Sequence, residues 1–214
     1  MIMLNLGALL EFDYLMKFSF AIISLFVSLL ALMVYRLSGN QQSKWFGVSF
    51  FLISISYFIQ SALNFSFAAS FLQQICYPMS IKNINIACQN LHMLFYIAGL
   101  TTLTYMSLKI QSIKTLLLLI LINVLSLVFA TSANLFFLLS SIMLFFVFIH
   151  FLHNYLHKKQ SHSMIALIAF ALIFANSVHN LLNIDHNVFL IITNFTQLLA
   201  FFLIFVNLFL IVRK

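Results

Sequence analysis

The chain contains very little charge. Only 6% of its 214 residues are Asp, Glu, Lys or Arg, and only three of them are acidic. A soluble domain carries about 25% charged residues. Here 64% of the residues are hydrophobic and the mean hydropathy is +1.14. No soluble core could bury this much apolar side chain, so we expect lipid to be the solvent for most of the chain.

The net charge of +7 does not indicate a nucleic-acid partner. The basic residues are not gathered into one patch but occur one or two at a time at the ends of apolar runs. Residues that determine membrane topology are distributed in this way. The expected partner is therefore the lipid bilayer.

Seven apolar segments are long enough to cross a membrane, which takes about 20 residues. They should be helices, because a helix satisfies its own backbone in lipid and the alternation of a β-barrel is missing. We predict one all-α membrane domain, a seven-helix bundle over residues 1–214. The turn "FATSANLF" is the weakest boundary, and without it the count falls to six with one long helix. The predicted spans lie near 14–35, 45–67, 85–108, 115–132, 135–156, 163–183 and 187–212.

The basic residues predict the orientation. With seven spans, four groups of them fall on one side, and the positive-inside rule makes that side cytoplasmic. The other side holds all three acids, so we predict a multi-pass protein of the cell membrane with its N-terminus outside and C-terminus inside. Aromatic residues of the interfaces agree, among them Trp45 and Tyr105 on the inner side. The four basic groups are Arg36 with Lys44, Lys109 with Lys114, Lys158 with Lys159, and Arg213 with Lys214.

The chain has two cysteines, Cys76 and Cys88. The predicted topology places both on the outer, oxidising side, where disulfides persist. We therefore predict a Cys76–Cys88 disulfide. The alternative is that both are small apolar residues packed in lipid or protein.

Two segments of the chain share a pattern. Residues 35–64 and 155–183 each begin with a tyrosine, cross a basic polar loop, enter a span and end in a polar turn. In this alignment Gln60 meets His179 and Asn64 meets Asn183. This is the layout of a three-plus-one-plus-three parallel duplication. Two amphiphilic hairpins could share the same features by chance.

The stretch "FIHFLHNYLHKKQSHS" places His150, His153 and His157 on one face of the fifth span, at its inner end. Imidazoles at this spacing can bind zinc or copper. No carboxylate or cysteine on that side completes such a site, so we interpret the three histidines as a structural polar stripe at the interface.

Polar side chains of four spans lie at a similar depth near the outer side. Amides in hydrocarbon are costly unless paired, so they should face inward and meet one another. They form either a hydrogen-bond network that joins the helices or an outward-facing pocket for a small ligand. The candidates are Tyr57, Gln60, Asn64, Gln89, His92, Tyr96, Asn176, His179, Asn180, Asn194 and Gln197.

Several functions fit this cluster. A ligand-binding or sensory module is the first, with a partner subunit or a second copy of the chain to relay a signal. The second is redox, because His92 and His179 on different spans could ligate a b-type haem, or copper or zinc. A structural subunit of a membrane complex and a small-solute transporter are further alternatives. One proline and four glycines argue against the broken helices that many transporters use.

Missing motifs exclude other functions and leave catalysis unsupported. The last span has no lysine, which excludes a retinal Schiff base of the microbial-rhodopsin type. No Asp or Glu lies inside an expected span, which argues against aspartyl proteolysis and proton-driven exchange. GxSxG and CxxC are absent, which weakens serine-hydrolase and thiol-redox readings.

The stretch "YRLSGNQQSKWFGVSFFLISISYFI" followed by "LHMLFYIAGL" resembles small archaeal seven-helix membrane proteins with no assigned activity. The likeness covers the first three spans and consists of the hydropathy rhythm with the Y-R-x-x-G and L-H elements. It implies the helical membrane fold and no chemistry.

Overall fold

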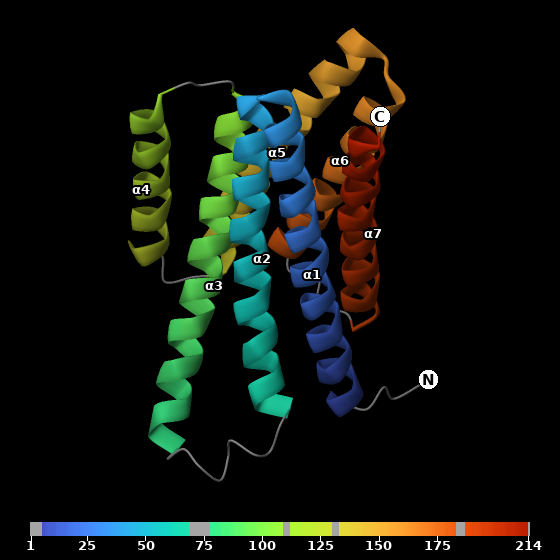
Figure 1. Ribbon diagram of the computed structural model, residues 1–214. Helices are drawn as coiled ribbons and strands as arrows, with labels where there is room; N and C mark the ends of the chain where they lie inside the picture. The colour runs from blue at the N-terminus through green and yellow to red at the C-terminus, as the bar shows by residue number, and fades with distance from the viewer. Residues whose placement is uncertain (1–5, 69–77, 109–111, 130–132, 183–186, 214) are drawn as a thin grey trace.

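The computed structural model describes residues 6–68, 78–108, 112–129, 133–182 and 187–213, and these form seven helices. Successive helices run in alternate directions (Figure 1). The all-helical architecture predicted from the sequence is thus confirmed. The helices are α1 (Leu6–Ser38), α2 (Gln41–Ala68), α3 (Pro78–Ser107), α4 (Ile113–Phe129), α5 (Ala133–Lys158), α6 (Ser161–Leu181) and α7 (Asn187–Val212).

Six of the helices form a closed ring in the order α1, α2, α3, α5, α6, α7, with α7 packed against α1. Helix α4 stands outside this ring, against α3 and the edge of α5 (Figure 1). The ring therefore has two halves, α1–α3 and α5–α7. They meet along two seams, one between α1 and α7 and the other between α3 and α5.

Six helices are long and apolar enough to cross a membrane, namely all except α4. Helix α4 has 17 residues, which gives it a length of about 25 Å against a hydrocarbon layer of about 30 Å. The chain is therefore a multi-pass helical membrane protein, while a seventh crossing stays a prediction. The alternative of one long helix in place of the fourth and fifth is wrong, because α4 ends at Phe129 and α5 begins at Ala133.

The surface and the interior of the bundle differ in their side chains. Large apolar residues face outward, such as Leu117 on α4, which is 62% exposed. This surface suits contact with lipid. Phenylalanines fill the middle of the ring, where Phe20, Phe50 and Phe201 are at most 2% exposed.

The described basic side chains apart from Lys17 lie at the end of the bundle where α1 finishes, which we call the basic end. The opposite end, where α1 begins, is called the cavity end, because a cavity lies in that half of the bundle. The side chain of Lys82 lies outside the described residues. The basic end carries Arg36, Lys44, Lys114, Lys159 and Arg213.

Two expectations about single side chains need correction. Cys88 is a free cysteine, and Cys76 lies outside the described residues, so the predicted disulfide is not supported. Tyr105 is not an interfacial residue in contact with lipid. It is 2% exposed and packs edge-on against Trp45 with ring centroids 5.5 Å apart, because its face of α3 turns toward α2.

Glycines and serines allow the helices of the first half to approach closely. A Cβ atom on Gly99 of α3 would lie 2.9 Å from the carbonyl oxygen of Ser49 on α2. The Oγ of Ser28 on α1 donates to the carbonyl of Gly47 on α2 at 2.8 Å, and Ser54 on α2 donates to the carbonyl of Ala21 on α1 at 2.8 Å. Small residues and hydroxyl bonds of this kind hold helices together in lipid.

Replacing Gly99 with alanine should lower the free energy of unfolding by about 1–3 kcal/mol, the usual cost of an overpacked contact. The added methyl group would meet the Ser49 carbonyl, which belongs to the backbone of α2 and cannot turn away. Thermal unfolding followed by the fluorescence of Trp45, the only tryptophan, measures the change.

Gly47→Ala is the matched control. Its added Cβ would lie 2.9 Å from the side chain of Leu32 and 3.2 Å from the carbonyl oxygen of Ser28, a looser backbone contact than the one Gly99 makes with Ser49. This variant should lose less stability than Gly99→Ala. An equal or larger loss for Gly47→Ala would show that the α2–α3 contact is not the tight one.

Candidate functional site

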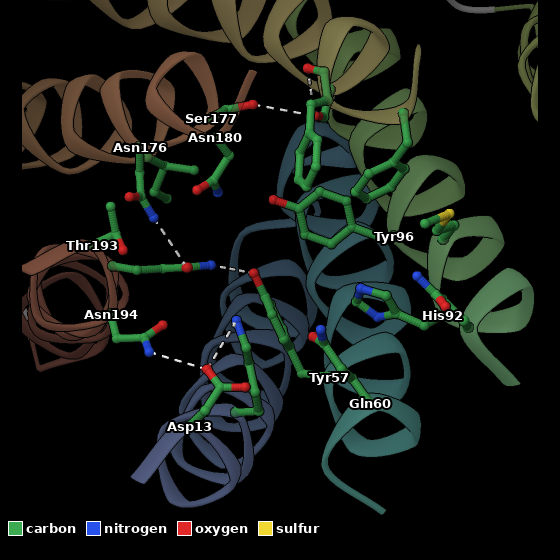
Figure 2. Close-up of a pocket in the computed structure, with 18 of the residues that line it drawn as sticks. Asp13, Tyr57, Gln60, His92, Tyr96, Asn176, Ser177, Asn180, Thr193 and Asn194 are labelled. Atoms are coloured by element: carbon green, nitrogen blue, oxygen red, sulfur yellow. Dashed lines mark hydrogen bonds and ion pairs between the residues drawn. The ribbon is translucent and has the colours of Figure 1, made fainter. Parts of the chain in front are cut away.

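A cavity of about 530 Å³ lies inside the ring, in the half of the bundle nearest the cavity end. All six ring helices contribute lining residues. No described residue of α4 lines the cavity. Figure 2 shows side chains from these helices pointing into the common space. The ring closure places them there, because each helix turns its polar face away from lipid.

The structure brings most of the predicted polar cluster together. Two predicted members are different: the side chain of Asn64 lies outside the described residues, and His179 is not among the lining residues. Gln89 and Asn180 are exposed at the rim, whereas His92, Asn176, Asn194 and Gln197 are each at most 8% exposed. The predicted residues that line the cavity are Tyr57, Gln60, Gln89, His92, Tyr96, Asn176, Asn180, Asn194 and Gln197.

A chain of hydrogen bonds crosses the ring at the deep end of the cavity. Asn176 Nδ2 on α6 donates to Gln197 Oε1 on α7 at 3.1 Å, and Gln197 Nε2 donates to the hydroxyl of Tyr57 on α2 (Figure 2). We call these three residues the amide bridge. Helices α2 and α7 are not neighbours in the ring, so the bridge spans its interior and forms the floor of the cavity.

One oxygen atom of the amide bridge lacks a hydrogen bond. Asn176 is 7% exposed, and its Oδ1 has no hydrogen-bond partner. A buried carbonyl without a partner costs about 1–3 kcal/mol, so such atoms are usually satisfied by water or a ligand. Asn176 therefore presents an acceptor for a molecule inside the cavity.

His92 is fixed by contacts with Ser56 on α2. Its Nδ1 lies 3.0 Å from the Ser56 carbonyl oxygen, and the Ser56 Oγ donates to the His92 carbonyl at 2.9 Å. A carbonyl only accepts, so Nδ1 carries a proton, and in the neutral ring Nε2 then keeps its lone pair. This assignment satisfies both bonds, and Ser56 Oγ then receives the Nδ1–H at 2.6 Å. The neutral imidazole in this geometry has one acceptor nitrogen left, Nε2.

An ion pair lies in the cavity wall and was missed by the sequence analysis. Lys17 Nζ is 3.9 Å from Asp13 Oδ1, which also accepts from Asn194 Nδ2 at 3.1 Å. Asp13 comes just before the first expected span and lies within the Phe12–Ser38 stretch of α1, which is long and apolar enough to cross a membrane. The sequence did carry a signal for this ion pair, because Asp13 and Lys17 are four residues apart and therefore lie on one face of a helix.

Asp13 and Lys17 are the only charged side chains among the described lining residues, so these residues have no net charge. The polar wall also includes three hydroxyl side chains of the second half, namely Ser140 of α5, Ser177 of α6 and Thr193 of α7. The Oγ atoms of Ser140 and Ser177 lie 3.1 Å apart, which joins α5 to α6.

The structure offers little support for a bis-histidine haem. His92 lines the cavity and His179 does not, so the two imidazoles do not face one common space there. On α6 the lining residues are Ile173, Asn176, Ser177 and Asn180. His179 precedes Asn180 by one position, which turns it about 100° around the helix from that residue.

The inner histidines stay on one helix. His153 and His157 lie with their Nε2 atoms 3.0 Å apart, and His150 Nε2 lies 2.9 Å from Asn154 Nδ2. The described part of the chain holds no group of three His, Cys, Asp or Glu side chains that could bind a metal ion. The interpretation of these histidines as a structural polar stripe stays a prediction.

Comparisons with known proteins supply no family for this chain. No family model, no curated protein and no solved structure matches it. The resemblance to archaeal seven-helix proteins stays a prediction, and the function has to be argued from the cavity.

Tyr57→Phe and Gln197→Leu should be coupled in a double-mutant cycle, because each removes one partner of the bond that spans the ring. The expected coupling energy is about 0.6–1.7 kcal/mol, the range for hydrogen bonds between helices in a membrane. Reversible unfolding of the four proteins in mixed micelles measures it.

A hydrogen bond between α4 and the outer side of the ring provides the control. Asn123 Nδ2 on α4 donates to Thr101 Oγ1 on α3 at 3.0 Å, so Asn123→Leu should add independently to Tyr57→Phe. If Tyr57→Phe and Gln197→Leu also add independently, the bridge across the ring is not formed.

Proposed function

We propose that the protein binds a small, polar solute without net charge in the cavity of its helix ring. The single observation that carries this is a cavity of about 530 Å³ whose floor is an amide bridge with an unpaired buried acceptor. Pockets for small ligands have volumes of about 300–1,000 Å³. The cavity lies well inside this range.

A purely structural network is the competing explanation. Helices joined only for stability would close on their polar groups and leave little space among them, since interiors are packed as densely as organic crystals. Here all six ring helices turn polar side chains toward a space that they leave open. Asn176 Oδ1 remains without a protein partner at its deep end.

The lining favours a solute with both donors and acceptors. Asn176 Oδ1 and the Nε2 lone pair of His92 accept hydrogen bonds, whereas Lys17 donates. Tyr57 and Tyr96, whose rings meet edge-on with centroids 5.8 Å apart, add aromatic surface. A net charge on the solute would be costly at this depth, because Asp13 and Lys17 already neutralise each other.

The orientation is part of the proposal. The basic end lies in the cytoplasm by the positive-inside rule, so the cavity faces outward across the cell membrane. Helix α4 then makes the seventh crossing, which keeps the N-terminus outside and the C-terminus inside. The same reading makes α1–α3 and α5–α7 the two units of the predicted duplication.

A solute that binds should stabilise the protein against heat. At a concentration of 100 times Kd the gain is about 2.7 kcal/mol. The measurement is thermal unfolding of the purified chain with free amino acids, polyols and nucleosides, each tested separately. Asn176→Leu should abolish the gain, because leucine has no acceptor and fills part of the space.

Asn123→Leu is the matched control for that experiment. Asn123 is a buried amide on α4, outside the ring, so this variant should keep the stabilisation. Equal loss in both variants would assign the effect to general destabilisation. No stabilisation of the wild-type protein by any compound in the three classes would favour the structural network instead.

A further inference from the structure

A second cavity of about 200 Å³ lies in the same ring, at the basic end. Its lining includes Asn40, His150, Asn154 and Asn207, and no charged side chain among the described residues. Asn207 on α7 is 8% exposed, and its Oδ1 has no hydrogen-bond partner. The second cavity therefore repeats the chemistry of the first, with amides, an imidazole and one unpaired buried carbonyl.

The two cavities approach each other most closely along α6 and α7. On α6, Ile173 lines the larger cavity and Phe170 the smaller one, three residues away. On α7, Gln197 lines the larger and Ile204 the smaller, seven residues away. At 1.5 Å per residue these separations are about 5 Å and about 10 Å. On the other four ring helices the nearest lining residues of the two cavities are 10 to 14 positions apart, about 15–21 Å. A packed stretch of the ring interior therefore separates the cavities, and it is thinnest beside α6 and α7.

Aromatic side chains fill that stretch. Phe20 of α1, Phe50 of α2 and Phe201 of α7 form what we call the aromatic plug. Phe201 lies with its ring centroid 5.9 Å from Tyr57 in the floor of the larger cavity, and 6.1 Å from Phe50. Phe50 in turn stacks at 4.7 Å on Phe46, which lines the smaller cavity.

The plug is shared between the two halves of the ring. Phe20 and Phe50 belong to α1–α3, whereas Phe201 belongs to α5–α7. Within each half, hydroxyl and amide groups tie the helices to one another, as Ser28 does for α1 and α2 and Ser177 for α5 and α6. Movement of one half against the other would separate Phe201 from Phe50 without breaking those bonds. It would break the bonds that cross between the halves, from Gln197 to Tyr57 and from Asn194 to Asp13, and a bound solute could replace these.

We propose that the ring encloses a path for the solute across the membrane, with the two cavities as its entrances and the aromatic plug as its gate. This inference rests on the proposed function, because the larger cavity is the binding site from which the solute enters. The helices need not break. The two halves rock about the α1–α7 and α3–α5 seams and expose the cavities in turn.

Cysteine accessibility tests the path without knowledge of the solute. Ala200 lies on the same face of α7 as Gln197 and Ile204, between the cavities, and is 0% exposed. In a Cys76→Ser, Cys88→Ser background, Ala200→Cys is treated with membrane-impermeant sulfonatoethyl methanethiosulfonate. The reagent is applied to one face at a time, in sealed vesicles of each orientation.

Three further single-cysteine variants in this background calibrate the reaction. Asn176→Cys should react faster from the cavity end and Asn207→Cys faster from the basic end. Thr101→Cys is the matched buried control, since Thr101 is 0% exposed but faces α4 outside the ring. It should not react from either face.

The path predicts that Ala200→Cys reacts from both faces. Its rate should be about 0.1–10% of the rate of the calibrating variant on that face, the usual population of a minor conformation. Reaction from one face only, or no faster than Thr101→Cys, overturns the path and leaves two separate cavities. Failure of Asn176→Cys to react from the cavity end would instead remove the open binding site, and the proposed function with it.

Discussion

In hydrocarbon an amide has no water to bond, so each one must find a partner inside the protein or in a space the protein keeps polar. The amide bridge meets this requirement at the centre of the ring, where Asn176, Gln197 and Tyr57 are hydrogen-bonded to one another in a chain. It links α6 and α7, which are neighbours in the ring, to α2, which is a neighbour of neither. The cavity lies on one side of this bridge and the aromatic plug on the other.

Ring closure follows from the same constraint. Six helices with polar groups on one face and large apolar residues on the other can shelter all of those groups only by facing one another around a common axis. Helix α4 needs no such shelter, because its one buried amide, Asn123, bonds to Thr101 of α3. It can therefore remain outside, where it links the two halves along the chain.

Hydropathy and charge were enough to predict the helices and the polar cluster, because lipid imposes length and apolarity on every crossing and pairing on every amide. The end of α7, for instance, was predicted at the residue where the helix stops. Asp13 was missed because an acid at the edge of an apolar run looks like its boundary, and only its partners Lys17 and Asn194 show that it faces inward. The place of α4 was not predictable, since periodicity does not say which helix lies outside a ring.

Helix α4 also sets a condition on the surrounding lipid. Its 17 residues reach about 25 Å, whereas α3 beside it has 30 residues. A short apolar helix is accommodated by local thinning of the bilayer, at a modest free-energy cost for each ångström of mismatch. With α4 as the proposed seventh crossing, lipid beside α3 and α4 would be thinner than lipid on the far side of the ring. The chain length of the lipids would then affect the α3–α5 seam more than the α1–α7 seam.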